Sequence, residues 1–254
     1  RDFFDLFNHR FVSLFYRAWE KYRLPSAYER ARWREGNEYD PFSSALFHFT
    51  GTGTAGLRGR LNTGDEVLLY YGGLIAQQPR SASALAAMGG DYFGVPVDVR
   101  QFTGAWLWLE PADRTVIGRG GSNNLLGNTA ILGRRFWDQQ ADFTVRLGPL
   151  TFHQFHEFLP CDRAFAPLVD LIRFFVGSTL DFDIRLVLKA SQVPACKLIK
   201  PGLRSPRLGW SSWLKTKEFT RNASDARLGR HLTRIKTSSR QNSGASLEEV
   251  ANDE

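Results

Sequence analysis

The chain has 254 residues, 43% hydrophobic and 23% charged, which is typical of a globular protein and atypical of a disordered one. Its formal charge of +7 leaves a nucleic-acid partner open, although acidic residues are interspersed and no long Lys/Arg block occurs. Two cysteines are too few for a disulfide framework, and no apolar run approaches the ~18 residues of a membrane span. We therefore expect a reducing, cytoplasmic setting.

The first predicted element is an aromatic-rich helix in the run Asp5–Pro25, which Leu24 and Pro25 end. Tyr16 and Trp19 widen its apolar arc beyond what a simple surface helix needs. We expect this helix to be covered on more than one side, by its own domain or by a partner that contacts Tyr16 and Trp19. The main apolar stripe follows spacings of three and four: Phe4, Phe7, Phe11, Leu14, Phe15, Ala18 and Tyr22.

The next predicted elements alternate between helices and strands. A short helix is expected from Asp40 to Phe49. Periodicity and caps in the later chain predict four more helices, over 65–78, 81–94, 150–159 and 164–177. Asp65 would cap the helix over 65–78, and Ser81 or Ser83 would start the helix over 81–94. Strands are predicted over 95–102, 141–150 and 180–188, with a loop that carries Trp106, Leu107 and Trp108.

These elements predict an α+β fold with an internal duplication. Both proposed copies contain a helix that ends in Asp91–Gly94 or Phe174–Gly177, then a strand, a long Trp-bearing loop and a second strand. The predicted domains are an N-terminal helical region over 1–64, one helix–strand–loop–strand unit over 65–150, a second over 151–230, and a polar tail over 231–254 that we expect to be disordered. A repeated unit predicts one kind of surface presented twice.

The sequence offers little that favours an enzyme. His153, His156 and Glu157 are the nearest approach to a metal site, but no third ligand of suitable spacing stands out. Phe152, Phe155 and Phe158 share the same predicted helix, so the histidines either bind a metal ion or flank a core stripe. No phosphate-binding loop and no G-x-S-x-G motif occurs. We predict no catalytic residues and no cofactor; a metal-dependent hydrolase is kept as a minor alternative.

Tryptophan is the most informative side chain of the two loops. Trp106 and Trp108 would lie on one face if their stretch is extended, and Trp210 and Trp213 occupy the matching part of the second unit. Two interpretations remain open: these residues, with Leu107, close each sheet as part of the core, or they anchor hydrophobic loops on a partner.

Five runs, taken in order, closely resemble the TssG family, also called VasB or ImpH. They are DLFNHRFVSLFYRAWEKYR, MGGDYFGVPVDVRQFTGAWL, LGRRFWDQQADFTVRLGPLTFHQFHEFLP, VGSTLDFDIRLVLKASQVPACKL and LGWSSWL. The resemblance spans Asp2 to about Leu214. It covers the later part of the family's sequence, so we expect a further amino-terminal segment before Arg1.

The resemblance implies a structural role in the type VI secretion system, a contractile, phage-tail-like injection machine. A TssG subunit belongs to the baseplate wedge, associates with two copies of TssF and with TssE, and connects through two loops to two TssK trimers. We expect those loops to be 104–128 and 191–213, in a cytoplasmic protein at the membrane-docked baseplate. The alternative is a nucleic-acid-binding protein that uses its basic surface, notably Arg227–Arg240.

Overall fold

The computed structural model describes residues 2–33, 39–118, 120–160, 162–196, 206–229 and 232. The chain divides into two compact units, Arg1–Pro79 and Arg80–Glu254, which are considered separately below. The first unit is helical and the second contains all the described strands. The α+β class that the sequence predicts is confirmed.

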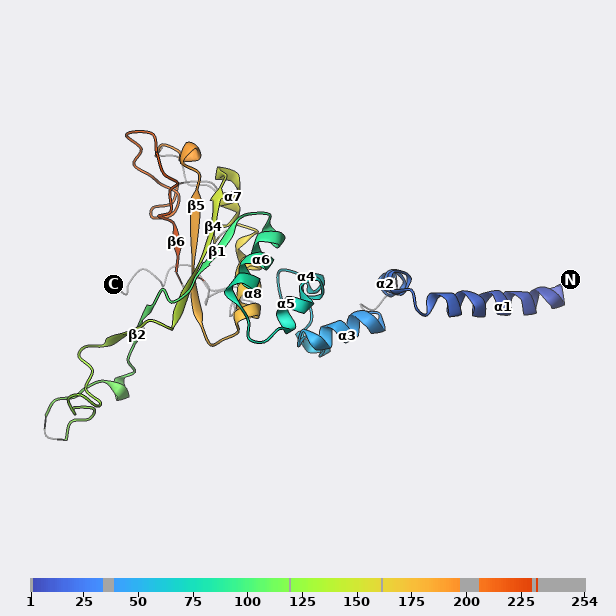
Figure 1. Ribbon diagram of the computed structural model, residues 1–254, viewed down its shortest axis with the longest axis horizontal. Helices are drawn as coiled ribbons and strands as arrows, with labels where there is room; N and C mark the ends of the chain where they lie inside the picture. Colours follow the sequence, from blue (N-terminus) through green and yellow to red (C-terminus); the bar gives the residue numbers. More distant parts are fainter. Residues whose placement is uncertain are drawn as a thin grey trace, which may run out of the picture. The chain divides into compact units, whose positions relative to one another are not determined.

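The first unit begins with the aromatic helix and continues through short helices (Figure 1). Helix α1 ends at Glu20, and Pro25 lies in the first turn of the next helix, where its missing N–H costs nothing. That second helix was not predicted from the sequence. The helices of this unit are α1 (Asp2–Glu20), α2 (Leu24–Trp33), α3 (Pro41–Phe49), η1 (Ala55–Leu57), α4 (Asp65–Tyr70) and α5 (Gly72–Ala76).

Helix α3 has the predicted bounds because its start is capped. A carboxylate oxygen of Asp40 accepts hydrogen bonds from the backbone N–H groups of Phe42 and Ser43, each at 3.1 Å. The helix then buries Phe47 completely, against the ring of Tyr39 and under the guanidinium of Arg58. Phe47 shares the core of the first unit with the buried Leu68, Tyr71 and Ile75.

The prediction of one helix over 65–78 was wrong. Two short helices occupy this stretch, and Tyr71 lies between them. Gly64, with a φ of 77°, is the N-cap residue, while the Asp65 carboxylate accepts hydrogen bonds from Gly59 N–H at 2.9 and 3.1 Å. The Gly72–Gly73 pair weakens a continuous helix because glycine loses the most backbone entropy on folding.

The second unit is a four-stranded sheet in the order β1-β4-β5-β6. Strand β4 pairs antiparallel with β1 and parallel with β5, and β5 pairs antiparallel with β6. Two helices, α7 and α8, make the crossover between the parallel strands. The bounds are α6 (Ala82–Phe93), β1 (Val97–Arg100), β4 (Asp142–Leu150), α7 (Phe152–Glu157), α8 (Phe165–Val176), β5 (Asp181–Leu188), η3 (Ala190–Gln192) and β6 (Arg227–Leu228).

Helices α6 and α8 lie on one face of this sheet (Figure 1). Alternate strand residues on that face are fully enclosed, among them Val145, Leu147, Ile184 and Leu186. Gly89 brings α6 close to the same face, because a Cβ added there would lie 3.6 Å from the side chain of Val97. The residues in between therefore point to the opposite face, away from these helices.

A second, two-stranded sheet replaces part of the predicted Trp-bearing loop. Strand β2 (Ala105–Trp108) pairs antiparallel with β3 (Arg135–Asp138), and the short helix η2 (Pro111–Asp113) lies in the segment between them. Assigning Trp106, Leu107 and Trp108 to a loop was therefore wrong. Local sequence did not predict this pairing because the partner strand is distant along the chain and only four residues long.

Both predicted units contain a helix, a strand, a long connection and a second strand, in that order. The last strand of the second unit has only two residues, so the internal duplication stays a prediction, as does the division at residues 64, 150 and 230. Of the predicted disordered tail over 231–254, all but Leu232 lies outside the described residues.

Candidate protein-docking surfaces

Helix α1 exposes its apolar stripe along its whole length. Phe11 is 66% exposed and Phe15 77% exposed, and the described part of the chain does not cover either side chain. Of the two interpretations left open for this helix, coverage by its own domain is excluded for the described residues. The exposed large apolar side chains of α1 are Phe3, Phe4, Leu6, Phe7, Phe11, Val12, Leu14, Phe15, Tyr16 and Trp19.

The carboxyl end of α1 is held to α2. Glu20, the buried residue of α1, forms an ion pair with Arg30. The guanidinium of Arg23 lies 4.2 Å from the ring centre of Trp19, and the Tyr16 ring lies 5.6 Å from that of Trp19. Tyr16 and Trp19 therefore remain half-exposed beside a cation, in an arrangement that suits a protein contact.

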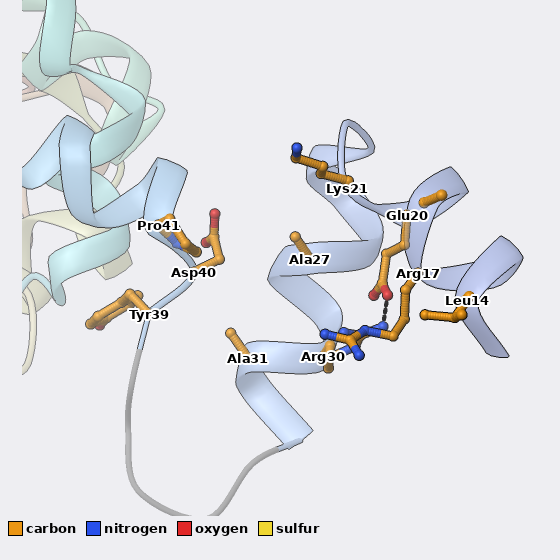
Figure 2. Close-up of a pocket in the computed structure, with 11 residues that line it drawn as sticks. Leu14, Arg17, Glu20, Lys21, Ala27, Arg30, Ala31, Tyr39, Asp40 and Pro41 are labelled. Carbon is orange, nitrogen blue, oxygen red and sulfur yellow. Dashed lines mark ion pairs between the residues drawn. The ribbon is translucent and has the colours of Figure 1, made fainter. Parts of the chain in front are cut away.

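Helices α1 and α2 border a hollow of about 720 Å³ that also reaches Asp40. Figure 2 shows the Glu20–Arg30 ion pair on one side of this hollow and Asp40 on another. Arg17 and Lys21 also line it, so the hollow holds charges of both signs. Among the described residues, no serine, cysteine or histidine lines it.

Helix α2 is connected to α4 by polar contacts. The Tyr28 hydroxyl donates a hydrogen bond to the Glu66 carboxylate at 2.9 Å, and Arg32 lies 3.1 Å from the same oxygen. The hydrogen bond to Glu66 raises the pKa of Tyr28, because the charged carboxylate favours the protonated phenol. These contacts connect α2, which borders the hollow, to α4 of the same unit.

In the second unit, strands β2 and β3 form a ribbon with an aromatic face. Trp106 lies opposite Trp137, and their ring centres are 5.5 Å apart in an edge-to-face arrangement. Trp108 lies opposite Arg135, whose guanidinium is 5.0 Å from the Trp108 ring centre. Trp108 is 64% exposed, whereas Leu107 points to the other face and is half-buried. The stretch is extended, so the condition under which Trp106 and Trp108 were expected to share a face is met, although the stretch was predicted to be a loop.

Gly104 allows the aromatic face to form. Its φ is +68°, and a Cβ added there would lie 2.2 Å from a ring carbon of Trp137. The Trp137 ring is held in this position by a hydrogen bond from its Nε1 to the Gln139 side chain at 2.9 Å. A residue with a side chain at position 104 would therefore displace the tryptophan that packs against Trp106.

The chain between β2 and β3 continues the ribbon as an arm over 109–134, at the end of the four-stranded sheet where β1 ends (Figure 1). Leu109 N–H donates to Arg134 O at 2.9 Å, and Ile131 N–H donates to the Thr115 hydroxyl at 2.9 Å. Large apolar side chains are exposed on the arm: Val116, Ile117, Leu125, Leu126, Ile131 and Leu132. No sequence motif had marked these six side chains as candidates for docking.

The second Trp-bearing segment is arranged differently. Trp213 is only 8% exposed, packs against Phe155 of α7 and donates a hydrogen bond to Asp225 at 3.3 Å. It therefore belongs to the core of the second unit. Trp210 is half-buried, and the exposed apolar residues of this segment are Leu208 and Leu214. Residues 197–205 of this predicted loop lie outside the described residues.

His153 and His156 do not meet a third ligand in the part of the chain that the structure describes. His153 Nδ1 lies 3.7 Å from Glu157, which Arg163 also engages, and the His156 ring packs on Phe152. The basic stretch 227–240 is described only at its start, where Arg227 is bound to buried Asp183.

Comparison with known proteins identifies the family to which this chain belongs. The family model for TssG of type VI secretion matches residues 1–215. The chain belongs to the TssG family. No curated protein sequence matches it. Among the described residues, no helix has the length and hydrophobicity that crossing a membrane requires.

Two solved structures have a similar fold, each at 22% sequence identity. One is a chain from a cryo-electron microscopy structure of the type VI secretion system TssK-TssF-TssG baseplate subcomplex, with a TM-score of 0.71 over 89% of this chain and 92% of that one. The other comes from the baseplate complex of the type VI secretion system, with a TM-score of 0.60 over 88% of this chain and 62% of that one.

Proposed function

We propose that this chain is a structural subunit of a type VI secretion baseplate, where it forms a wedge with TssF and TssE and connects to TssK. It acts by holding its partners in place and performs no catalysis. Membership of the TssG family and the likeness to chains from two baseplate assemblies support this role. The protein would act in the cytoplasm, at the membrane-docked baseplate.

The aromatic exposure of α1 carries the proposal. A helix with apolar side chains around most of its circumference is stable in water only when other surfaces cover it. We assign α1, including Tyr16 and Trp19, to the contact with TssF, which would cover its exposed apolar side chains. Without TssF, the free chain is expected to self-associate through the same helix.

We assign the contacts with TssK to two segments, the arm with its aromatic ribbon and the segment after β5. Strand β1 is antiparallel to β4, and β4 is parallel to β5, so β1 and β5 run in opposite directions. The segments that follow their carboxyl ends therefore leave the sheet at opposite ends. This arrangement supports two separate docking positions, with Trp106 and Trp108 in one and Trp210 in the other.

Co-expression with TssF, TssK and TssE of the same organism, followed by native mass measurement, tests the proposal. The expected result is a complex that contains this chain, TssF and TssK together. The arm is tested by replacing residues 109–134 with Asn-Gly, a two-residue turn that closes a hairpin after the Trp108–Arg135 pair. This variant should lose part of the TssK stoichiometry and keep TssF; unchanged TssK stoichiometry would exclude the arm.

A further inference from the structure

Strand β3 presents an open edge of the two-stranded ribbon. Leu109 N–H donates to Arg134 O at 2.9 Å, so these two residues form a hydrogen-bonded pair of the antiparallel ladder. Such pairs alternate with pairs that exchange no hydrogen bond, and the register gives this second kind of pairing to Arg135 and Trp137. The backbone N–H and C=O groups of Arg135 and Trp137 therefore point away from β2, toward the outer edge of β3.

This edge is uncovered in the part of the chain that the structure describes. No hydrogen bond joins the backbone of Arg135 or Trp137 to another described residue, and the sheet that contains β3 has only two strands. The ribbon extends away from helices α6 and α8 (Figure 1). Trp137 is 47% exposed and Phe136 is 36% exposed, so β3 is accessible to another protein.

The side chains of the outward-facing residues lean toward β2 and leave the edge clear. The Arg135 guanidinium lies 5.0 Å from the ring centre of Trp108 and 5.8 Å from that of Trp106, and the Trp137 ring packs on Trp106. Proteins commonly protect an open edge with a proline, a bulge or a charged side chain. Strand β3 has no proline, its register with β2 is continuous, and its arginine lies over the tryptophans of β2.

We propose that β3 accepts a strand from TssK, so that the complex contains a three-stranded sheet; this rests on the assignment of the arm and its ribbon to TssK. An isolated two-stranded ribbon is only marginally stable in water, and a third strand would pair with the open backbone groups. The incoming segment is extended and has apolar side chains at alternate positions, because those side chains lie beside Trp137 on the aromatic face.

The main test compares Arg135→Pro with Arg135→Ala in the full chain, titrated with purified TssK. Both variants lose the guanidinium, but only the proline variant loses the outward N–H. Proline is tolerated at the first residue of an edge strand, which is the position of Arg135 in β3. Both variants keep the second docking segment, so a difference between them reports on β3.

Strand addition predicts that Arg135→Pro weakens one TssK binding event about two- to tenfold relative to Arg135→Ala, the effect of one lost hydrogen bond. Equal affinities of the two variants would overturn the strand addition and leave the assignment to TssK intact. Failure of the original chain to bind TssK would overturn both. The two variants should have the same near-ultraviolet circular dichroism; if proline alters it, hydrogen exchange in the original chain decides.

Hydrogen exchange, resolved to single residues by mass spectrometry, needs no substitution. In the free chain, Phe136 N–H points to β2 and should exchange slowly, whereas Arg135 and Trp137 should exchange rapidly. Saturating TssK should slow exchange at Arg135 and Trp137, and unchanged rates at both positions would overturn the proposal. Protection that appears without TssK and grows with the concentration of the chain would assign the edge to a second copy, which also overturns it.

Discussion

Replacing two phenylalanines of α1 by serine separates the docking role of this helix from its own stability. Phe11 and Phe15 lie on the exposed stripe, so in the monomer, at concentrations too low for self-association, the double substitution removes apolar surface that already faces water. Serine and phenylalanine have nearly the same helix propensity, so α1 itself should persist. The change in the free energy of unfolding should stay within about 0.5 kcal/mol.

The effect on docking is expected to be far larger. Burying a whole phenylalanine is worth about 1.5–3 kcal/mol. Scaled by the exposed fractions of 66% and 77% for Phe11 and Phe15, the pair would contribute roughly 2–4 kcal/mol on complete burial. That corresponds to a Kd for TssF roughly 30- to 700-fold weaker in the double variant.

Binding is measured by titration with purified TssF, self-association by light scattering, and stability by urea unfolding. The double variant should bind TssF weakly and self-associate less than the original chain. His9→Ser, on the polar face of α1, is the matched control and should bind normally. Phe47→Ala should keep the affinity for TssF but lower the free energy of unfolding. Removing this enclosed side chain is expected to cost about 3–5 kcal/mol of stability. Normal TssF affinity in the double variant, or a large loss of its stability, would refute the assignment of α1.

Three smaller predictions concern single contacts. Gly104→Ala should displace the Trp137 ring and change the near-ultraviolet circular dichroism of the ribbon, while unaltered tryptophan signals would contradict the packing. Asp40→Ala should cost about 0.5–2 kcal/mol in urea unfolding and Asp40→Asn less, because asparagine still caps α3; equal costs would mean that the cap is unimportant. Tyr28→Phe should lower the free energy of unfolding below pH ~10, where the neutral phenol donates to Glu66. The stability difference between the variant and the original chain should vanish as pH rises through the raised pKa of Tyr28. A difference that does not depend on pH would exclude this bond.

Local chemistry accounts for the elements that the sequence predicted well. The Asp40 carboxylate and the Ser81 hydroxyl cap α3 and α6 through bonds to nearby N–H groups, so the start of each helix is encoded within a few residues. Strand β5 buries nearly every residue after Asp181, and helix α8 follows a 3.6-residue period. These patterns need no knowledge of the partner segment.

The candidate docking surfaces depended on contacts between distant residues. Both tryptophan pairs looked alike in the sequence, yet Trp106 lies on a half-exposed ribbon and Trp213 is enclosed against Phe155. The exposure of Trp106 depends on pairing with β3, some 30 residues further along the chain, and the burial of Trp213 depends on packing against α7. No local sequence pattern therefore distinguishes the two tryptophans.

The sequence alone determined that this protein is α+β, contains an aromatic helix and resembles the TssG family, because periodicity, caps and motifs are properties of short segments. Only the tertiary structure decided which of its apolar and charged side chains lie on the surface. Burial depends on which surfaces of the folded chain cover a residue, and those surfaces come from segments far away in the sequence. Helix α1 illustrates both points. The spacing of its aromatic residues predicted the apolar stripe, but only the structure shows that no other described segment covers it.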